Sequence, residues 1–130
     1  MTKEIIKTSN APAAIGAYSQ AVKVTNKGET VYVSGQIPLD PESMEVVSED
    51  FEMQTRQVFT NLFAVIKAAG GSFESIIKLN VYLIDLSKFS ILNDVMQELF
   101  KQPFPARAAV QVSALPKQVQ IEIDAVLHID

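Results

Sequence analysis

A single arginine interrupts an apolar segment in the last quarter of the chain. Arg107 lies in the sequence FPARAAVQV, residues 104–112. Arginine keeps its positive charge at every physiological pH, and its planar guanidinium can bind a carboxylate through two parallel hydrogen bonds. Two roles fit this pattern. Arg107 either forms an ion pair across two strands, which contributes little at a surface, or it belongs to a functional site.

The other reactive residue types favour neither metal nor nucleophile chemistry. The absence of cysteine excludes disulfides, thiolate zinc sites and thiol nucleophiles. The one histidine, His128, is interpreted as a strand-end residue rather than a base. Ser19 and Ser34 have no adjacent base that would activate a hydroxyl nucleophile. Because no acidic spacing matches a calcium loop and no phosphate-binding glycine loop is present, the sequence predicts no metal and no cofactor.

Composition narrows the class of protein. The 130 residues, 48% of them hydrophobic, predict one domain spanning residues 1–130. The net charge of −4 and the lack of a Lys and Arg cluster make a nucleic acid an unlikely partner. No apolar run is long enough to span a membrane, and residues 1–8 do not resemble a signal peptide. The expected location is the cytoplasm.

The periodicity of apolar residues predicts eight elements in the order β-β-β-α-β-α-β-β. The clearest helix covers Asp50 to Ala69, where apolar residues recur at three- and four-residue steps and a Gly-Gly pair follows. A second helix is expected within residues 85–102. Strands are expected at 4–7, 20–25, 30–34, 76–84, 107–113 and 119–129. The loop NKGE, residues 26–29, predicts a hairpin between the second and third strands.

This order predicts an α/β fold in which two helices cover one face of a mixed sheet. The other face is left uncovered, and on the last strand it carries Glu122 and Asp124 together with Val126, which suits a subunit interface. A hairpin between the last two strands, around the residues LPK, would place Arg107 opposite Glu122 to Asp124 on this same mixed face.

Five motifs give the chain a family resemblance. The segments IGAYSQAV, VYVSGQIP, FSILNDV, FPAR and LPKQVQIEIDAV together resemble the RidA (YjgF-type) family of reactive-intermediate deaminases, and the resemblance spans nearly all 130 residues. It implies a chorismate-mutase-like α/β fold and a homotrimer. In that trimer the sheets pack into a central barrel, and three sites lie in the clefts between subunits.

The resemblance also implies an activity and a set of site residues. Family members hydrolyse 2-imino and enamino acids, such as 2-aminoacrylate released by pyridoxal-phosphate enzymes, to 2-keto acids and ammonia without a cofactor. The family arginine falls on Arg107 and the family glutamate on Glu122. The implied substrate-binding positions are Tyr18, Ser34 with Gly35, Asn93 and Arg107 itself. The guanidinium would hold the substrate carboxylate, and Glu122 would orient or deprotonate a water.

Three positions depart from the family pattern. Ala17 replaces a usual proline, which removes a restraint on φ in the loop that carries Tyr18. Ala109 replaces a common cysteine, and Met96 replaces a frequent aromatic. A second function stays open, in which the protein binds a small carboxylate such as a 2-keto acid without turnover and acts as a regulator.

Overall fold

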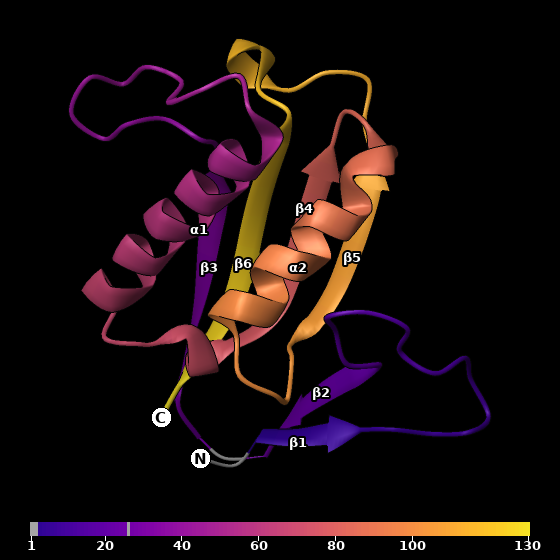
Figure 1. Cartoon of the computed structure of the whole chain (residues 1–130). Coiled ribbons are helices and arrows are strands. Elements are labelled where there is room, and N and C mark those ends of the chain that lie inside the picture. The colour runs from indigo at the N-terminus through magenta and orange to yellow at the C-terminus, as the bar shows by residue number, and fades with distance from the viewer. Residues whose placement is uncertain (1–2, 26) are drawn as a thin grey trace.

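Two helices pack against one face of a four-stranded sheet in the computed structural model, which describes residues 3–25 and 27–130 (Figure 1). The predicted order of eight elements is confirmed, and three single turns of 3-10 helix lie at residues 73–75, 86–88 and 116–118. The elements are β1 (Lys3–Ile6), β2 (Ala21–Val24), β3 (Glu29–Gln36), α1 (Phe51–Ala68), β4 (Ile76–Leu83), α2 (Phe89–Leu99), β5 (Ala106–Gln111) and β6 (Ile121–Ile129).

Helix α1 begins and ends where the sequence predicts. The Asp50 side chain accepts a hydrogen bond from the Met53 amide at 3.0 Å, which satisfies one of the free N–H groups at the helix start. Gly70 follows the last turn with a φ of +91°, a conformation that glycine adopts without a Cβ clash. The apolar face of α1 packs on the sheet through Val58, Leu62 and Ile66, all fully buried.

The strand order in the main sheet is β3-β6-β4-β5. Strand β6 pairs antiparallel with both β3 and β4, whereas β5 runs parallel to β4 at the edge. The predicted hairpin between the last two strands is therefore wrong. Residues 112–120 connect β5 to β6 past the end of β4, and Val112 donates to the Leu83 carbonyl along this route. Alternation along a strand predicts which residues share a face, but it does not encode which strand is the neighbour.

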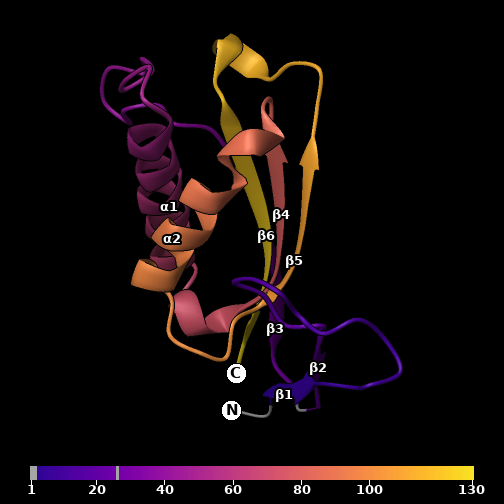
Figure 2. The same ribbon diagram turned by 45° about the vertical axis from the view of Figure 1, so that its right-hand side comes forward.

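The first two strands form a separate small sheet below the main one (Figure 2). Strand β2 pairs antiparallel with β1, with Ile5 opposite Val22. The predicted hairpin between the second and third strands is also wrong, since β3 pairs with β6. The Gln20 side chain holds the loop between β1 and β2, accepting from the Thr8 amide and donating to the Pro12 carbonyl. These bonds hold the long loop in place beside the β1–β2 pair.

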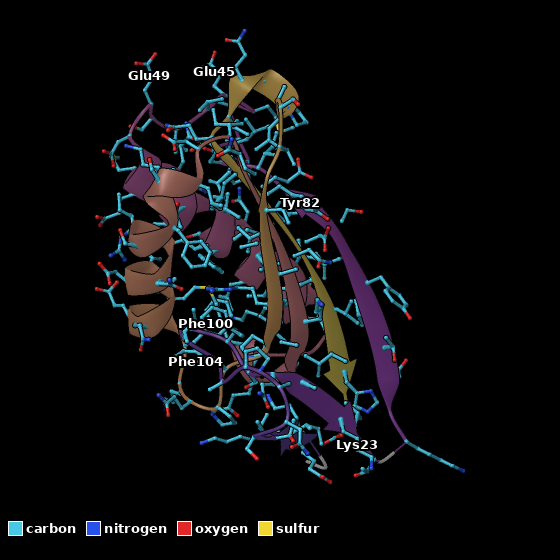
Figure 3. The ribbon with its side chains drawn as sticks, turned by 90° about the vertical axis from the view of Figure 1, so that its right-hand side faces the viewer. Lys23, Glu45, Glu49, Tyr82, Phe100 and Phe104 are labelled. Atoms are coloured by element: carbon cyan, nitrogen blue, oxygen red, sulfur yellow. The ribbon has the colours of Figure 1, made fainter. Side chains whose placement is uncertain are left out.

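The two faces of the main sheet differ in cover. The helix-covered face carries the core, in which Leu79, Leu83, Ile121 and Ile123 are fully buried. The opposite face, called the open face below, carries no helix, and there Tyr32 is 79% exposed and Val110 46% exposed. Figure 3 views the sheet from its edge, with Phe100 on the helix side and Tyr82 on the open side. Within residues 3–25 and 27–130, no helix has the length and apolar character needed to cross a bilayer.

Candidate active site

Arg107 lies on the helix-covered face of the sheet. In the parallel ladder it is opposite Leu79, which is fully buried, and Ala109 beside it packs against the core. Glu122 is opposite Tyr82, on the open face. The expected placement of Arg107 and Glu122 on one face is therefore wrong. The row of Ala108 and Val110 is apolar, as a core row would be, but in the structure it is exposed on the open face.

Four side chains surround the Arg107 guanidinium. Its Nη1 donates to Asn93 Oδ1 at 2.7 Å and contacts Met96 Sδ at 3.4 Å. Its central carbon lies 5.2 Å from the ring centre of Tyr18 and 4.9 Å from that of Phe89. Aromatic rings at these distances attract a cation and also exclude water from it. The guanidinium is thus held in one place by α2 and by the loop before β2.

The electrostatics of Arg107 differ from those of a surface ion pair. Burial lowers the pKa of the Arg107 guanidinium, and the Tyr18 phenol acts in the opposite direction. Arginine nevertheless stays charged at physiological pH. None of the carboxylates in the described chain forms an ion pair with Arg107. The ion-pair explanation of this residue is wrong, and a desolvated cation with unused donors remains to bind an anion.

The loop that carries Tyr18 is attached to the start of β5. The Ser19 amide donates to the Pro105 carbonyl at 2.9 Å, and the Ser19 hydroxyl donates to the Phe104 carbonyl. Ala17 is fully buried, and its amide lies 3.5 Å from Asn93 Oδ1, a long hydrogen bond. These contacts hold the loop next to Arg107 although Ala17 lacks the φ restraint of a proline.

Glu122 forms a second cluster with the end of β3. The register of β3 against β6 shifts between Val33 and Gln36, so Ser34 and Gly35 form a bulge there. A Cβ added to Gly35 would overlap the Glu122 carboxylate. The missing side chain of Gly35 therefore makes room for Glu122. Ser34 and Gly35 are both exposed beside it.

A side chain of α1 holds the start of β6 in place through hydrogen bonds. Gln54, only 3% exposed, accepts from the Gln120 amide at 2.8 Å and donates to the Ser48 carbonyl at 2.8 Å. Gln120 precedes β6 by one residue, so these bonds set the register from which Glu122 projects. Burial raises the pKa of the Glu122 carboxyl, and the like charge of Asp124 raises it further.

The predicted residues thus fall into two clusters on opposite faces of one chain. Tyr18, Asn93 and Arg107 lie together on the helix side, and Gly35 with Glu122 lie on the open side. Among the described residues, no three His, Cys, Asp or Glu side chains are grouped closely enough to hold a metal ion.

Two cavities of the described chain differ in how close they lie to the Arg107 cluster. A cavity of about 370 Å³ lies beside Tyr18 and is lined also by Gly16, Gln97 and Phe104. A larger one of about 730 Å³ lies at the lower ends of the helices, lined by Phe63, Phe73 and Phe100. The larger cavity is lined by none of the predicted site residues.

Phe89 and Met96 also contact the Arg107 guanidinium, although the sequence does not single them out as site residues. They lie on one helix face with Asn93, at spacings of four and three residues. A polar residue within an apolar stripe was the available signal, because a buried amide needs a polar partner. That partner is Arg107.

Known proteins resemble this chain over nearly its full length. The model of the family described as endoribonuclease L-PSP matches residues 8–129. A RutC family protein from Pyrococcus abyssi is 47% identical over 128 residues, which cover 98% of both chains. A 2-iminobutanoate/2-iminopropanoate deaminase from Bos taurus is 45% identical over 97% of this chain and 90% of its own length.

A solved structure agrees with these matches. The crystal structure of RidA from the Antarctic bacterium Psychrobacter sp. PAMC 21119 is 53% identical, with a TM-score of 0.75 over 97% of this chain and 99% of that one. Sequence and fold thus point to the same relatives, and the chain belongs to the RidA (YjgF) family, whose model is described as endoribonuclease L-PSP.

Proposed function

We propose that this protein is a cofactor-free deaminase that hydrolyses 2-imino acids, such as 2-iminobutanoate and 2-iminopropanoate, to 2-keto acids and ammonia. The observation that carries the proposal is the desolvated Arg107 guanidinium, held by Asn93 between two aromatic rings and without a carboxylate partner in the described chain. A small planar carboxylate fits its donors. Relatives at about this level of identity that carry the deaminase name support the choice of substrate class.

The active unit in this proposal is a homotrimer with three sites between subunits. Arg107 and Glu122 face opposite sides of the sheet within one chain. A site that uses both must therefore take Arg107 from one copy and Glu122 from its neighbour. The open face, with Tyr32 and Val110 exposed, is the surface we assign to packing between copies.

In the proposed reaction the substrate carboxylate binds Arg107, and the conjugated plane of the imine lies against the Tyr18 ring. Glu122 of the neighbouring copy takes a proton from water as the water oxygen bonds to the imine carbon, and passes that proton to the nitrogen. The hydroxyl proton follows by the same route as the carbon–nitrogen bond breaks. One water is consumed and one ammonia is released for each keto acid.

The physiological setting that we propose is the cytoplasm, where pyridoxal-phosphate enzymes release 2-aminoacrylate and its imine tautomer. A substrate that is already electrophilic needs no metal or nucleophilic side chain. This requirement matches the polar residues that are present, which bind a carboxylate and move a proton.

The test generates 2-aminoacrylate with a serine or threonine dehydratase and follows the decay of the imine. Addition of this protein should accelerate the decay, and Arg107→Ala should abolish the acceleration because the carboxylate loses its binding partner. A folded oligomer that leaves the decay rate unchanged would refute the deaminase proposal.

A second function, binding of a small carboxylate without turnover, has one observation in its favour. Among the described residues, the Arg107 cluster contains no carboxylate base on its own face of the sheet, so within one chain the anion-binding group is separated from Glu122. Calorimetry with pyruvate or 2-ketobutyrate distinguishes the two functions. Binding that depends on Arg107, together with no imine hydrolysis, would favour the regulatory role.

A further inference from the structure

Asp124 lies next to Glu122 on the open face of β6. The two residues are separated by one position, so their side chains project from the same side of the strand, about 7 Å apart at the backbone. Asp124 has no place in the proposed reaction. Its position beside the proposed base raises the question of what it contributes.

The Asp124 carboxylate is held by two residues of β4. Asn80, directly opposite in the ladder, donates from Nδ2 to Oδ1 at 2.8 Å. Tyr82 donates its hydroxyl to Oδ2 at 2.9 Å, although its own ladder partner is Glu122. Both carboxylate oxygens are thus hydrogen-bonded, which holds the Asp124 side chain in one position. The network fixes a negative charge at one point on the open face.

Few other charged groups of the described strands share the open face with Glu122 and Asp124. The bulge of β3 brings Gly35 against the Glu122 side chain, and β5 contributes Ala108 and Val110 to this face. The remaining titratable groups of the described strands on the open face are Tyr32 of β3, Lys78 and Tyr82 of β4, and His128 of β6. None of these four groups raises the pKa of the Glu122 carboxyl. Burial raises it most, and the charge of Asp124 raises it further.

We infer that Asp124 is a positioning residue for the proposed reaction, and that its carboxylate, fixed by Asn80 and Tyr82, strengthens Glu122 as a base. The inference rests on the proposed function. A fixed like charge disfavours the ionised form of a neighbouring carboxyl, so Glu122 accepts a proton from water more readily than an isolated glutamate. A base whose pKa is nearer to the working pH is also the more effective one, because it both accepts and returns the proton.

The first test is the pH profile of imine hydrolysis by Asp124→Asn, which removes the charge and keeps the size of the side chain. Activity depends on ionised Glu122, so the acid limb of the kcat profile reports its pKa. We expect this limb to move to lower pH and kcat on the plateau to fall, with little change in KM. Glu29→Gln is the matched control, since it removes one charge from the same sheet about 23 Å away along β6 and should leave the profile in place.

The second test measures the Glu122 carboxyl directly, by NMR titration of the protein labelled with ¹³C at glutamate carboxyls. Its pKa should fall in Asp124→Asn and stay at the wild-type value in Glu29→Gln. Tyr82→Phe removes one of the two bonds and should shift the pKa in the same direction by less. An unchanged Glu122 pKa in a folded Asp124→Asn variant would overturn the inference. A wild-type protein with no hydrolysis would instead refute the proposed function, while the titration would still decide the coupling.

Discussion

At the scale of single residues, the account depends on two charged groups in different environments. Arg107 is desolvated, stacked between two rings and bonded to an amide, which leaves a cation ready for an anion. Glu122 is partly buried beside a like charge, which makes it a better proton acceptor. Desolvation thus acts on both groups, and in the proposed reaction it favours ligand binding at Arg107 and proton transfer at Glu122.

Arg107→Lys should retain the charge and lose most of the binding. An ammonium cannot form two parallel bonds to a carboxylate, and the loss of one charged hydrogen bond predicts a KM about 10- to 100-fold higher. Steady-state kinetics of imine hydrolysis provide the measurement. Arg56→Lys, on the exposed face of α1 where the arginine pairs with Glu52 and Glu98, is the matched control and should have the wild-type KM. An unchanged KM in Arg107→Lys would argue against the bidentate role.

Glu122→Gln should remove activity without destabilising the fold at neutral pH. The pKa of Glu122 is raised in the folded chain. Between the unfolded pKa of about 4.3 and the higher folded pKa, the native state therefore binds the proton more tightly than the unfolded state does. Wild-type stability therefore falls as the pH rises through that range, and this loss is complete above the folded pKa. Glutamine has no such dependence.

Thermal unfolding from pH 3.5 to 8 tests this point. The variant should be at least as stable as the wild type at neutral pH, and this advantage should shrink as the pH falls toward 4. A variant that is less stable at neutral pH would show that ionised Glu122 has a stabilising partner in the assembled protein.

At the scale of elements, the sequence predicted which segments form helices and strands but not how the strands pair. The helix at residues 50–69 and the strand at 76–84 match α1 and β4 within two residues at each end. Periodicity is local, so it reports these elements directly. The two predicted hairpins failed because the partner of a strand is decided by tertiary packing.

The site shows the same division between local and tertiary information. The alternation of β5 correctly grouped Arg107 with Ala109 on one face, but an apolar row made of small residues was mistaken for the core row. The neighbourhood of Asn93 and Arg107 depends on α2 packing over β5, which no local pattern contains. Family resemblance supplied this pair, whereas Phe89 and Met96 became apparent only from the contacts.

The bulge in β3 gives a prediction at this scale. In Gly35→Ala the new Cβ must displace the Glu122 carboxylate or shift β3, because the two would overlap. A displacement of about 1 Å at the base predicts a loss in kcat/KM of roughly 100-fold. The kinetics and the thermal stability of the variant are the two measurements.

Gly70→Ala is the matched control for this substitution. Its φ of +91° disfavours alanine, but no atom lies within 4 Å of the added Cβ. It should lose about 1 kcal/mol of stability, the cost of an L side chain in the left-handed conformation, and keep the wild-type kcat/KM. If Gly35→Ala also kept its activity, the bulge would have no part in placing Glu122.

At the scale of the whole molecule, one chain carries the two halves of a site on opposite faces of its sheet. The helix side holds Arg107, and the open side holds Glu122. Such a chain is active, in the proposed account, only when a second copy brings its open side to the first copy's Arg107. The uncovered sheet face and the separation of Arg107 from Glu122 are then explained by the same assembly.

Subunit complementation tests this central claim most directly. Arg107→Ala and Glu122→Gln subunits, each inactive alone, are co-expressed with different tags, and mixed trimers are purified by both tags. An intact site forms wherever a Glu122→Gln subunit, which keeps Arg107, faces an Arg107→Ala subunit, which keeps Glu122. Random mixing in equal amounts predicts about one quarter of the wild-type activity before tag selection. Mixed trimers of Arg107→Ala with the double variant Arg107→Ala/Glu122→Gln should stay inactive. Recovered activity in the first mixture supports the shared site, and no activity in folded mixed trimers would contradict it.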